Sequence, residues 1–231
     1  GNISSQRMIQ MMNVKDDVLV IEEKGIYSVE NFLTARRLMY WQVYLHKTSL
    51  VTELILIKVM KRARELIQNK IEVNCSAPLS YFLNHNVSKE ELCSDALNTF
   101  ALLDDYDIIS ALKQWLTHDD FILRKLSTMI INRDLPKIIL SNDKFSSEET
   151  QNLLDRFLQN NKMTATEAKY FVFKGKIKNQ AYNKCLEPTR ILKKDGSVED
   201  VIDASDQLNL RALSKPVTKY YICFPKVLVE K

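Results

Sequence analysis

Hydrophobic and polar positions change their spacing along the chain, and this change separates a helical part from a part with strands. Apolar residues recur at helical spacing from residue 28 to about residue 69 with no glycine or proline between them. This pattern predicts one or two long helices, with a bend near Thr48 and Ser49. Shorter helices are expected at 5–12, 89–101, 105–117 and 119–132, and from residue 146 onward. A short strand is expected at 18–21, and a loop at 78–82.

The last third of the chain is richer in aromatic and β-branched residues. Strands are expected at 169–173 and 219–224, and a hairpin at 190–201 around the Asp195-Gly196 turn. The predicted fold is therefore mostly α with a small α+β lobe at the C-terminus. The expected division places a helical region at 1–145 and the α+β lobe at 146–231.

Composition narrows the class of protein. The chain has 231 residues, of which 45% are hydrophobic and 27% charged, as in ordinary soluble domains. Its most apolar stretch, 48–60, is interrupted by Glu53 and Lys58 and is too short to cross a bilayer, so no membrane partner is expected. The four cysteines, widely spaced and without a C-x-x-C pair, argue against a zinc site and favour reduced thiols in a cytoplasmic protein. They are Cys75, Cys93, Cys185 and Cys223.

Charge is unevenly distributed although the net charge is only +4. Residues 31–70 carry eight Lys or Arg and two Asp or Glu, whereas residues 89–120 carry two and eight. Such blocks can pack on each other within a chain or between subunits, or can form two separately solvated faces.

Several motifs that suggest chemistry have simpler interpretations. His118-Asp119 stands at a predicted helix start without further histidines nearby, which indicates a surface cap, and Asp104, Asp105 and Asp107 fit the acidic first turn of a helix. The four glycines are isolated, so no phosphate-binding loop is expected. Lysines and aromatics at 169–178 can be an edge strand guarded by lysines, and nucleic-acid binding is not expected.

One stretch carries a more specific signal. In a regular helix, Arg36, Tyr40, Tyr44 and Lys47 fall within an arc of about 80°, and Leu38, Trp41 and Leu45 point the opposite way. A guanidinium, two phenols and an ammonium on one face suit a phosphate with an adjacent sugar or base. A solvated cationic face would show the same spacing.

The motif Ala35-Arg36-x-x-Met39-Tyr40-x-x-Val43-Tyr44-x-His46-Lys47 resembles the segment just downstream of the metal site in HD-domain phosphohydrolases of the deoxynucleoside triphosphate triphosphohydrolase (dGTPase-like) type. The resemblance continues at 24–32, at 101–107, at 132–137 and, more weakly, at 220–226. It implies a metal-dependent enzyme that hydrolyses a deoxynucleoside triphosphate to deoxynucleoside and triphosphate.

The resemblance also assigns roles to residues. Arg36, Tyr40 and Tyr44 would bind the nucleotide substrate, and His46 and Lys47 would lie at a regulatory site or a subunit interface. The family's divalent-metal ligands, one His, an adjacent His-Asp pair and a later Asp, lie upstream of this motif, and no such set precedes Arg36. The chain is therefore expected to be the C-terminal part of a longer enzyme, with residues 1–145 packed on a missing HD core. Alone it would be inactive, with no catalytic residue and no bound metal.

Two expectations concern partners. Relatives of this kind form dimers or tetramers, and the helices at 28–69 carry more apolar positions than one packing stripe needs, so a homo-oligomer is expected. These positions are Leu50, Val51, Leu54, Ile55, Ile57 and Val59. The alternative to an enzyme is a helical interaction module that binds a partner protein or nucleic acid through its basic and acidic blocks.

Overall fold

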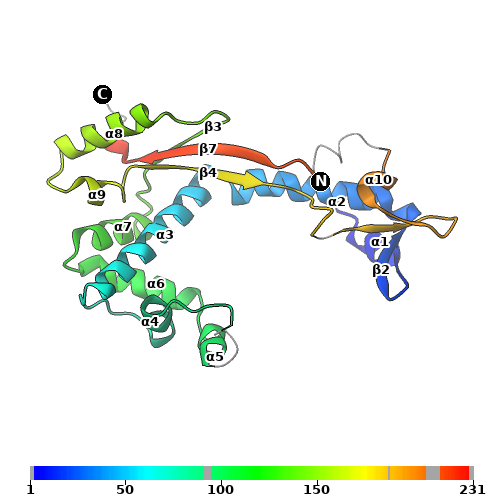
Figure 1. Cartoon of the computed structure of the whole chain (residues 1–231), viewed down its shortest axis with the longest axis horizontal. Coiled ribbons are helices and arrows are strands. Elements are labelled where there is room, and N and C mark those ends of the chain that lie inside the picture. Colours follow the sequence, from blue (N-terminus) through cyan, green and yellow to red (C-terminus); the bar gives the residue numbers. More distant parts are fainter. Residues whose placement is uncertain (1–2, 91–94, 187, 207–213, 229–231) are drawn as a thin grey trace. The chain divides into compact units, whose positions relative to one another are not determined.

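The computed structural model describes residues 3–90, 95–186, 188–206 and 214–228 (Figure 1). These residues pack into two compact units that interleave along the sequence. The first unit comprises Gly1–His46, Ser141–Asp143 and Lys176–Tyr220, and the second comprises Lys47–Leu140, Lys144–Gly175 and Tyr221–Lys231.

The first unit is built on a four-stranded sheet with the order β1-β2-β5-β6. Its elements are α1 (Ser5–Gln10), β1 (Met12–Lys15), β2 (Val18–Glu22), a 3₁₀ turn (Glu23–Gly25), α2 (Ile26–Met39), a π-helical turn (Tyr40–Tyr44), β5 (Arg190–Leu192), β6 (Val198–Asp200) and α10 (Val201–Ala204). Strand β2 pairs antiparallel with β1 and parallel with β5, and β5 pairs antiparallel with β6. Asp16 and Asp17 both have positive φ, as the tight hairpin turn between β1 and β2 requires.

Helix α2 supplies the apolar residues that cover this sheet. Ile26, Val29 and Leu33 follow one another at helical spacing and form one core cluster with Ile21 of β2 and Ile191 of β5. The N-terminal strands thus share a core with the hairpin near residue 190, which lies far away in the sequence. The predicted hairpin at 190–201 and the predicted strand at 18–21 are confirmed.

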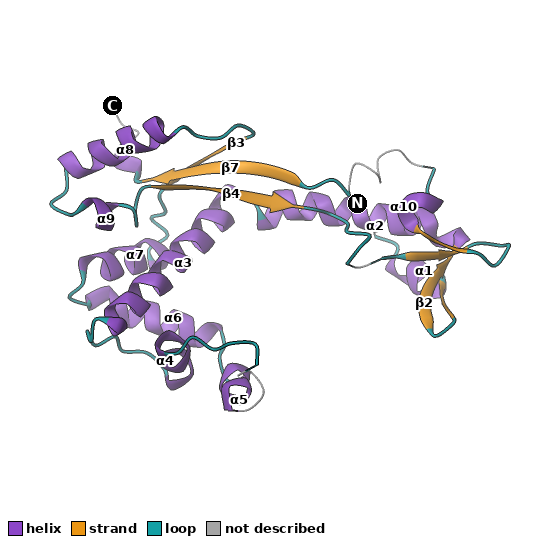
Figure 2. Cartoon of the chain, viewed as in Figure 1, coloured by secondary structure: helices purple, strands orange, loops and turns teal. Residues whose placement is uncertain are grey.

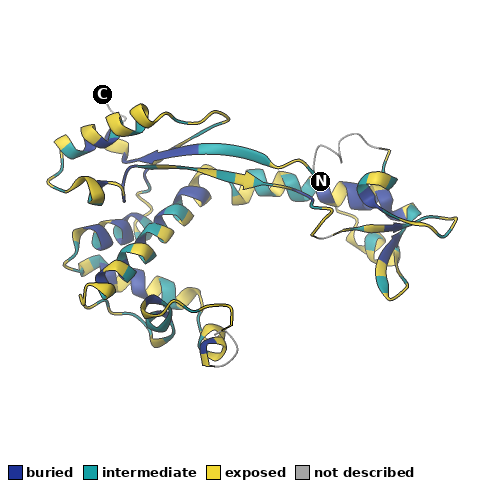
Figure 3. Ribbon diagram, in the orientation of Figure 1, coloured by how far each residue is buried: buried dark blue, intermediate teal, exposed yellow. Residues whose placement is uncertain are grey.

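The second unit contains most of the helices. Its elements are α3 (Lys47–Gln68), α4 (Ala77–Asn84), α5 (Asp95–Ala101), α6 (Asp105–Gln114), a 3₁₀ turn (Trp115–Thr117), α7 (Phe121–Ile131), α8 (Ser147–Gln159), α9 (Ala165–Ala168) and a 3₁₀ turn (Lys226–Leu228). Helix α3 packs on α7. The buried face of α3 has the four-residue spacing of a helix, and Figure 3 shows this face in dark blue. It consists of Leu50, Val51, Ile55, Val59, Ala63 and Leu66.

A second sheet has the order β3-β7-β4, with β3 at Lys137–Ser141, β7 at Val217–Phe224 and β4 at Phe173–Asn179. Ile222, Cys223 and Phe224 of β7 are buried. The chain is mostly helical with these two small sheets among the described residues, which confirms the predicted fold class (Figure 2). Both compact units take residues from before and after position 145, because β2 pairs with β5. The packing of residues 1–145 on an HD core stays a prediction.

Two local predictions were wrong, and the position of a third feature differs by about three residues. Residues 78–82 are not a loop but lie in α4, because Pro78 occupies the first turn, where a helix needs no amide donor. Residues 169–172 precede the strand, which begins at Phe173, because Thr164 and Glu167 form a capping box that starts α9 just before them. The helical run from 28 to 69 is broken at Leu45 and His46, slightly before the expected bend. Strands β1 and β3 were missed.

Other helices follow the predictions more closely. Asp104 caps α6 in a capping box with Asp107, as the acidic first turn suggested, and Ser146 caps α8 in the same way with Glu149. In the predicted helix 89–101, residues 95–101 are helical, and residues 91–94 lie outside the described part of the chain. Of the six apolar positions expected to exceed one packing stripe, four are buried within the second unit, and only Ile57, at 50%, is strongly exposed. They therefore give little support to a contact with a second chain.

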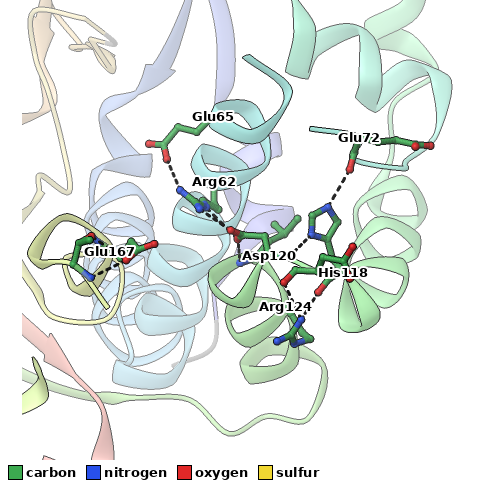
Figure 4. A network of polar contacts seen from close by, with 10 residues as sticks. Arg62, Glu65, Glu72, His118, Asp120, Arg124 and Glu167 are labelled. Carbon is green, nitrogen blue, oxygen red and sulfur yellow. Dashed lines mark hydrogen bonds and ion pairs between the residues drawn. The ribbon is translucent and has the colours of Figure 1, made fainter. Parts of the chain in front are cut away.

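One ion pair joins α3 to the start of α7, in addition to the packing of the two helices (Figure 4). The Arg62 guanidinium donates to both carboxylate oxygens of Asp120, at 3.1 Å from Nε and 2.6 Å from Nη2. The same carboxylate caps α7 by accepting the Leu123 amide at 2.8 Å. Burial alone would raise the pKa of Asp120, but the hydrogen bonds from Arg62 and Leu123 outweigh burial and lower it. The cap predicted at His118-Asp119 is thus provided by the next residue.

We expect Asp120→Asn to destabilise the chain by about 2 kcal/mol at pH 7, because Arg62 would lose its charged partner while partly buried. Urea unfolding of both proteins measures this difference. Because the folded-state pKa of Asp120 is lowered, its contribution is full above the unfolded value near 4 and is lost as the pH falls through the lower folded value. Asp119→Asn is the matched control, since that side chain is exposed. A pH-independent difference between Asp120→Asn and the unmodified chain would contradict this assignment.

Candidate nucleotide-binding site

Arg36, Tyr40 and Tyr44 form a continuous stack in the first unit, at the end of α2 and in the π-helical turn that follows it. The Arg36 guanidinium carbon lies 5.9 Å from the centre of the Tyr40 ring. The rings of Tyr40 and Tyr44 have their centres 5.2 Å apart and are tilted by 52°. Tyr44 is 53% exposed, whereas Arg36 and Tyr40 are half-buried. The three residues expected to share one face are therefore in contact.

The π-helical turn gives this segment its local geometry. The Leu45 amide donates to the Tyr40 carbonyl at 2.7 Å, five residues back, where an α-helix would use the fourth. The turn therefore holds one residue more than an α-helical turn. Leu45 and His46 then leave the helical conformation, and Lys47 begins α3 in the second unit. The predicted arc that joined Lys47 to the two tyrosines assumed an unbroken helix, and that assumption was wrong.

The opposite side of this segment is less buried than predicted. Leu38 was expected to pack but is 51% exposed, and neighbouring Val43 is 54% exposed. Trp41 and Leu45 are half-buried, and the Lys219 ammonium lies 4.5 Å from the centre of a Trp41 ring. Figure 3 shows exposed and half-buried positions along the later turns of α2. Within this chain, the helix end thus carries apolar side chains that its own core does not cover.

Arg36 also borders a cavity of about 360 Å³ inside the first unit. Apolar residues of α1, β2 and α2 line most of it, including Met8, Ile21 and Phe32. Arg190, at the start of β5, brings a second guanidinium to the same cavity. Sequence reasoning missed Arg190, because its position depends on the pairing of β5 with β2 and no local motif marks it.

Lys47 lies in a different place, in a basic cavity of about 310 Å³ in the second unit, here called the Lys47 pocket. Four cationic residues line it: Lys47, Arg133, Lys137 and Lys226. The intervening wall is aliphatic, with Val51, Leu135, Pro136 and Ile138, and Thr48 adds a hydroxyl. Arg133 adopts φ of 56°, so the turn before β3 takes a conformation uncommon for a non-glycine residue.

All four cations come from sequence blocks that carried the resemblance, and Lys47 is the last residue of the first of them. Arg133 and Lys137 belong to the block at 132–137, and Lys226 ends the block at 220–226. Of these four cations, only Lys47 was assigned a role from the sequence. No short motif indicates that the three blocks lie close together in the fold. His46, the other predicted regulatory residue, is exposed and immediately precedes α3.

The described residues do not form a metal-ligand set. Among them, no group of three or more His, Cys, Asp or Glu side chains converges. In the tempting His118-Asp119 pair, His118 Nδ1 accepts the Asp120 amide at 2.9 Å, and Nε2 faces the Glu72 carbonyl at 3.0 Å (Figure 4). Both imidazole nitrogens are thus used in holding the start of α7.

The described cysteines show no reactive arrangement. Cys75, Cys185 and Cys223 are free thiols, and burial raises the pKa of Cys223 to about 12. That direction disfavours the thiolate, which is the nucleophilic form. Cys93 lies outside the described residues. No helix in the described part of the chain combines the length and the hydrophobicity needed to cross a membrane.

The N-terminal third of the chain, which includes the stack of Arg36, Tyr40 and Tyr44, matches a known protein family. Residues 3–76 match the model of a family described as "HD associated region". The chain is 31% identical over 135 residues to the uncharacterized protein YwfO of Bacillus subtilis, a match that covers 58% of this chain and 30% of that protein. It is 29% identical over 183 residues to the uncharacterized protein MG461 homolog of Mycoplasma pneumoniae, and this match covers 74% of this chain and 41% of that protein.

Two solved structures are also similar. A phosphohydrolase from Bacteroides thetaiotaomicron is 44% identical, with a TM-score of 0.83 over 96% of this chain and 56% of that one. A hypothetical protein from Aquifex aeolicus has a TM-score of 0.59 at 20% identity, over 99% of this chain and 50% of that one. This likeness shows a similar fold and no more. The chain thus spans less than half of the two curated relatives and about half of these structures. The family match and the first structure together support an association with HD-family phosphohydrolases.

Proposed function

We propose that this chain is part of an HD-family phosphohydrolase that hydrolyses deoxynucleoside triphosphates to deoxynucleoside and triphosphate. The observation that carries the proposal is the stack of Arg36, Tyr40 and Tyr44 at the partly exposed end of α2. The match to the HD associated region supports it, because residues 3–76 include the whole stack. The phosphohydrolase from Bacteroides thetaiotaomicron supports the reaction class, and the resemblance of the Arg36 motif supplies the substrate.

The chemistry of the stack suits a nucleotide. An arginine guanidinium can donate two parallel hydrogen bonds to a phosphate. The exposed ring of Tyr44 offers a flat face to a sugar or a base, and its hydroxyl can donate or accept a hydrogen bond. Tyr40 lies between the two and holds the guanidinium by a cation–π contact, which reduces the freedom that Arg36 would lose on binding. In this proposal, Arg36 binds phosphate, Tyr44 contacts the sugar, and Tyr40 positions Arg36.

A divalent metal belongs to the proposed reaction, and the described residues do not fit it, because no ligand set converges among them. We therefore assign to this chain only the binding and orientation of the nucleotide. The metal ligands would come from a segment outside it, in keeping with the relatives, of which the chain covers only a part. The 231-residue chain alone would then be inactive.

A second candidate function is a helical interaction module, either without enzymatic activity or as the assembly part of the enzyme. The exposed side chains around the stack favour it, because Leu38, Met39 and Val43 are each at least 45% exposed on neighbouring positions. An HD core or a second copy of the chain could cover them. In the enzyme, both roles are compatible, with the apolar side chains packed on a partner and the stack facing the nucleotide.

For the enzyme that contains this chain, we expect Arg36→Lys to lower kcat/KM for deoxynucleoside triphosphates about thirtyfold. An ammonium cannot reproduce a two-point guanidinium–phosphate contact, and a loss of about 2 kcal/mol in the transition state corresponds to this factor. Release of inorganic triphosphate at saturating metal measures it. Tyr44→Phe should keep most activity, whereas Tyr44→Ala should lose the ring contact.

Arg37→Lys is the matched control, because it makes the same chemical change at the next position of the helix. The 231-residue chain without the rest of the enzyme provides the blank. Near-normal kinetics in both Arg36→Lys and Tyr44→Ala, with unchanged thermal stability, would favour the interaction module over the nucleotide-binding stack.

The Lys47 pocket supports a further part of the proposal, the binding of a polyphosphate at a regulatory position. We expect the 231-residue chain to bind inorganic triphosphate there, more weakly as salt rises, because several cations converge on one cavity. Isothermal titration calorimetry should show about fivefold weaker binding in Lys47→Gln and in Lys137→Gln, equivalent to ~1 kcal/mol each. Lys144→Gln, an exposed lysine elsewhere in the second unit, should bind like the unmodified chain. Equal affinity in all these proteins would contradict the assignment.

A further inference from the structure

A second cavity of the second unit has no role in the function proposed above. It has a volume of about 280 Å³ and is here called the Phe157 cavity. Its walls come from α7, the end of α8, the segment between α9 and β4, the turn before β3 and the turn that follows β7. Its apolar lining includes Phe121, Met129, Pro136, Phe157, Phe171 and Pro225.

Three phenylalanine rings make one wall of this cavity. The rings of Phe157 and Phe171 have their centres 5.5 Å apart at 46°, and those of Phe121 and Phe171 are 6.3 Å apart at 50°. Phe157 and Phe171 are buried, whereas Phe121 is 47% exposed. The wall is thus fixed by the core at its inner end and open at the other. Tilted rings at such distances accept a further aromatic ring in an offset or edge-on arrangement.

The polar part of the lining carries one net positive charge, because it has two lysines and one aspartate. Lys125 and Lys226 are exposed and contribute two ammonium groups, and the carboxylate in the lining, Asp134, lies 3.4 Å from the Lys226 ammonium. Lys125 has no ion-pair partner within the described ranges of the chain. The Asn161 amide nitrogen already donates to the Phe157 carbonyl at 2.8 Å. A ligand with a negative group at one end would therefore find a charge partner at Lys125.

We propose that the Phe157 cavity binds a small aromatic anion, with its ring against Phe121, Phe157 and Phe171 and its carboxylate or sulfonate at Lys125. The volume, about 280 Å³, is slightly below the usual range for ligand pockets, which begins at about 300 Å³, so it suits one or two rings rather than a nucleotide. The neighbouring Lys47 pocket has aliphatic walls and four cations, which suit a more highly charged group. The two cavities share Leu135, Pro136 and Lys226 and differ in what they can bind.

The test uses 4-(trifluoromethyl)benzoate as the probe, titrated against the 231-residue chain and followed by ¹⁹F NMR. We expect saturable line broadening, and about tenfold weaker binding of the neutral analogue 4-(trifluoromethyl)benzyl alcohol, a difference of ~1.4 kcal/mol. Lys125→Gln should reduce the affinity for the benzoate to that of the alcohol and leave the alcohol unchanged. Val227→Trp, at a 68% exposed position of the lining, should fill the opening and weaken both probes at least tenfold.

The controls separate this cavity from its neighbour and from general effects. Leu186→Trp adds the same ring at a 79% exposed position in the first unit, and Lys144→Gln removes a lysine away from both cavities, so both should bind normally. Thermal unfolding checks that each variant is folded. If Val227→Trp does not fold, Lys125→Gln still tests the proposal. The proposal is overturned by the absence of saturable binding, by benzoate affinity that is unaffected in Lys125→Gln, or by loss of binding in Lys137→Gln, which would place the probe in the Lys47 pocket.

Discussion

The hydrogen bond from the Leu45 amide to the Tyr40 carbonyl is the constraint on which the candidate site depends. It belongs to the wider π-helical turn that follows the end of α2 at Met39, and only Leu45 and His46 separate this turn from α3. Up to that point the helix is anchored, because Ile26, Val29 and Leu33 are buried against the four-stranded sheet. Arg36, Tyr40 and Tyr44 therefore extend from a fixed helix into a turn that its own unit covers only in part.

In the second unit, the packing of α3 on α7 determines where the cationic residues lie. The buried positions of α3 are repeated every three or four residues, and α3 packs on α7, in which Leu123 and Leu126 are also buried. The pair of Arg62 and Asp120 adds a directional contact at the point where α7 begins, and so fixes where that helix starts. The loop after α7 leads to Arg133 and Lys137, so the position of α7 determines where these two cations stand in the Lys47 pocket.

Local signals predicted most of the helices and the stack. Residues close together in the sequence are enough to predict three features. These are the apolar periodicity of α3 and α7, the capping boxes at Asp104 and Ser146, and the Asp-Gly turn before β6. The four-residue spacing of Arg36, Tyr40 and Tyr44 was likewise enough to put them together. Sequence alone could not show the π-helical turn, because no residue type marks it, and the prediction of a shared face for Lys47 failed for that reason.

Features that depend on distant pairing could not be predicted either. The sheet of the first unit joins β2 to β5 across about 170 positions of sequence, with Ile21 opposite Ile191, and Arg190 reaches the Arg36 cavity only through this pairing. The Phe157 cavity combines α7, α8 and the turn after β7, which share no motif. The short strands β1 and β3 have too few residues for a clear alternation of burial. Contacts of this kind become visible only when the chain is folded.

We propose that Arg36 and Tyr44 contact the substrate and that residues outside this chain hold the metal. A crystal structure of the whole protein with a non-hydrolysable deoxynucleoside triphosphate tests this claim most directly. We predict an Arg36 guanidinium nitrogen within about 3 Å of a phosphate oxygen and the Tyr44 ring against the deoxyribose. A bound nucleotide that touches neither residue, with the stack of Arg36, Tyr40 and Tyr44 packed instead against protein, would contradict it.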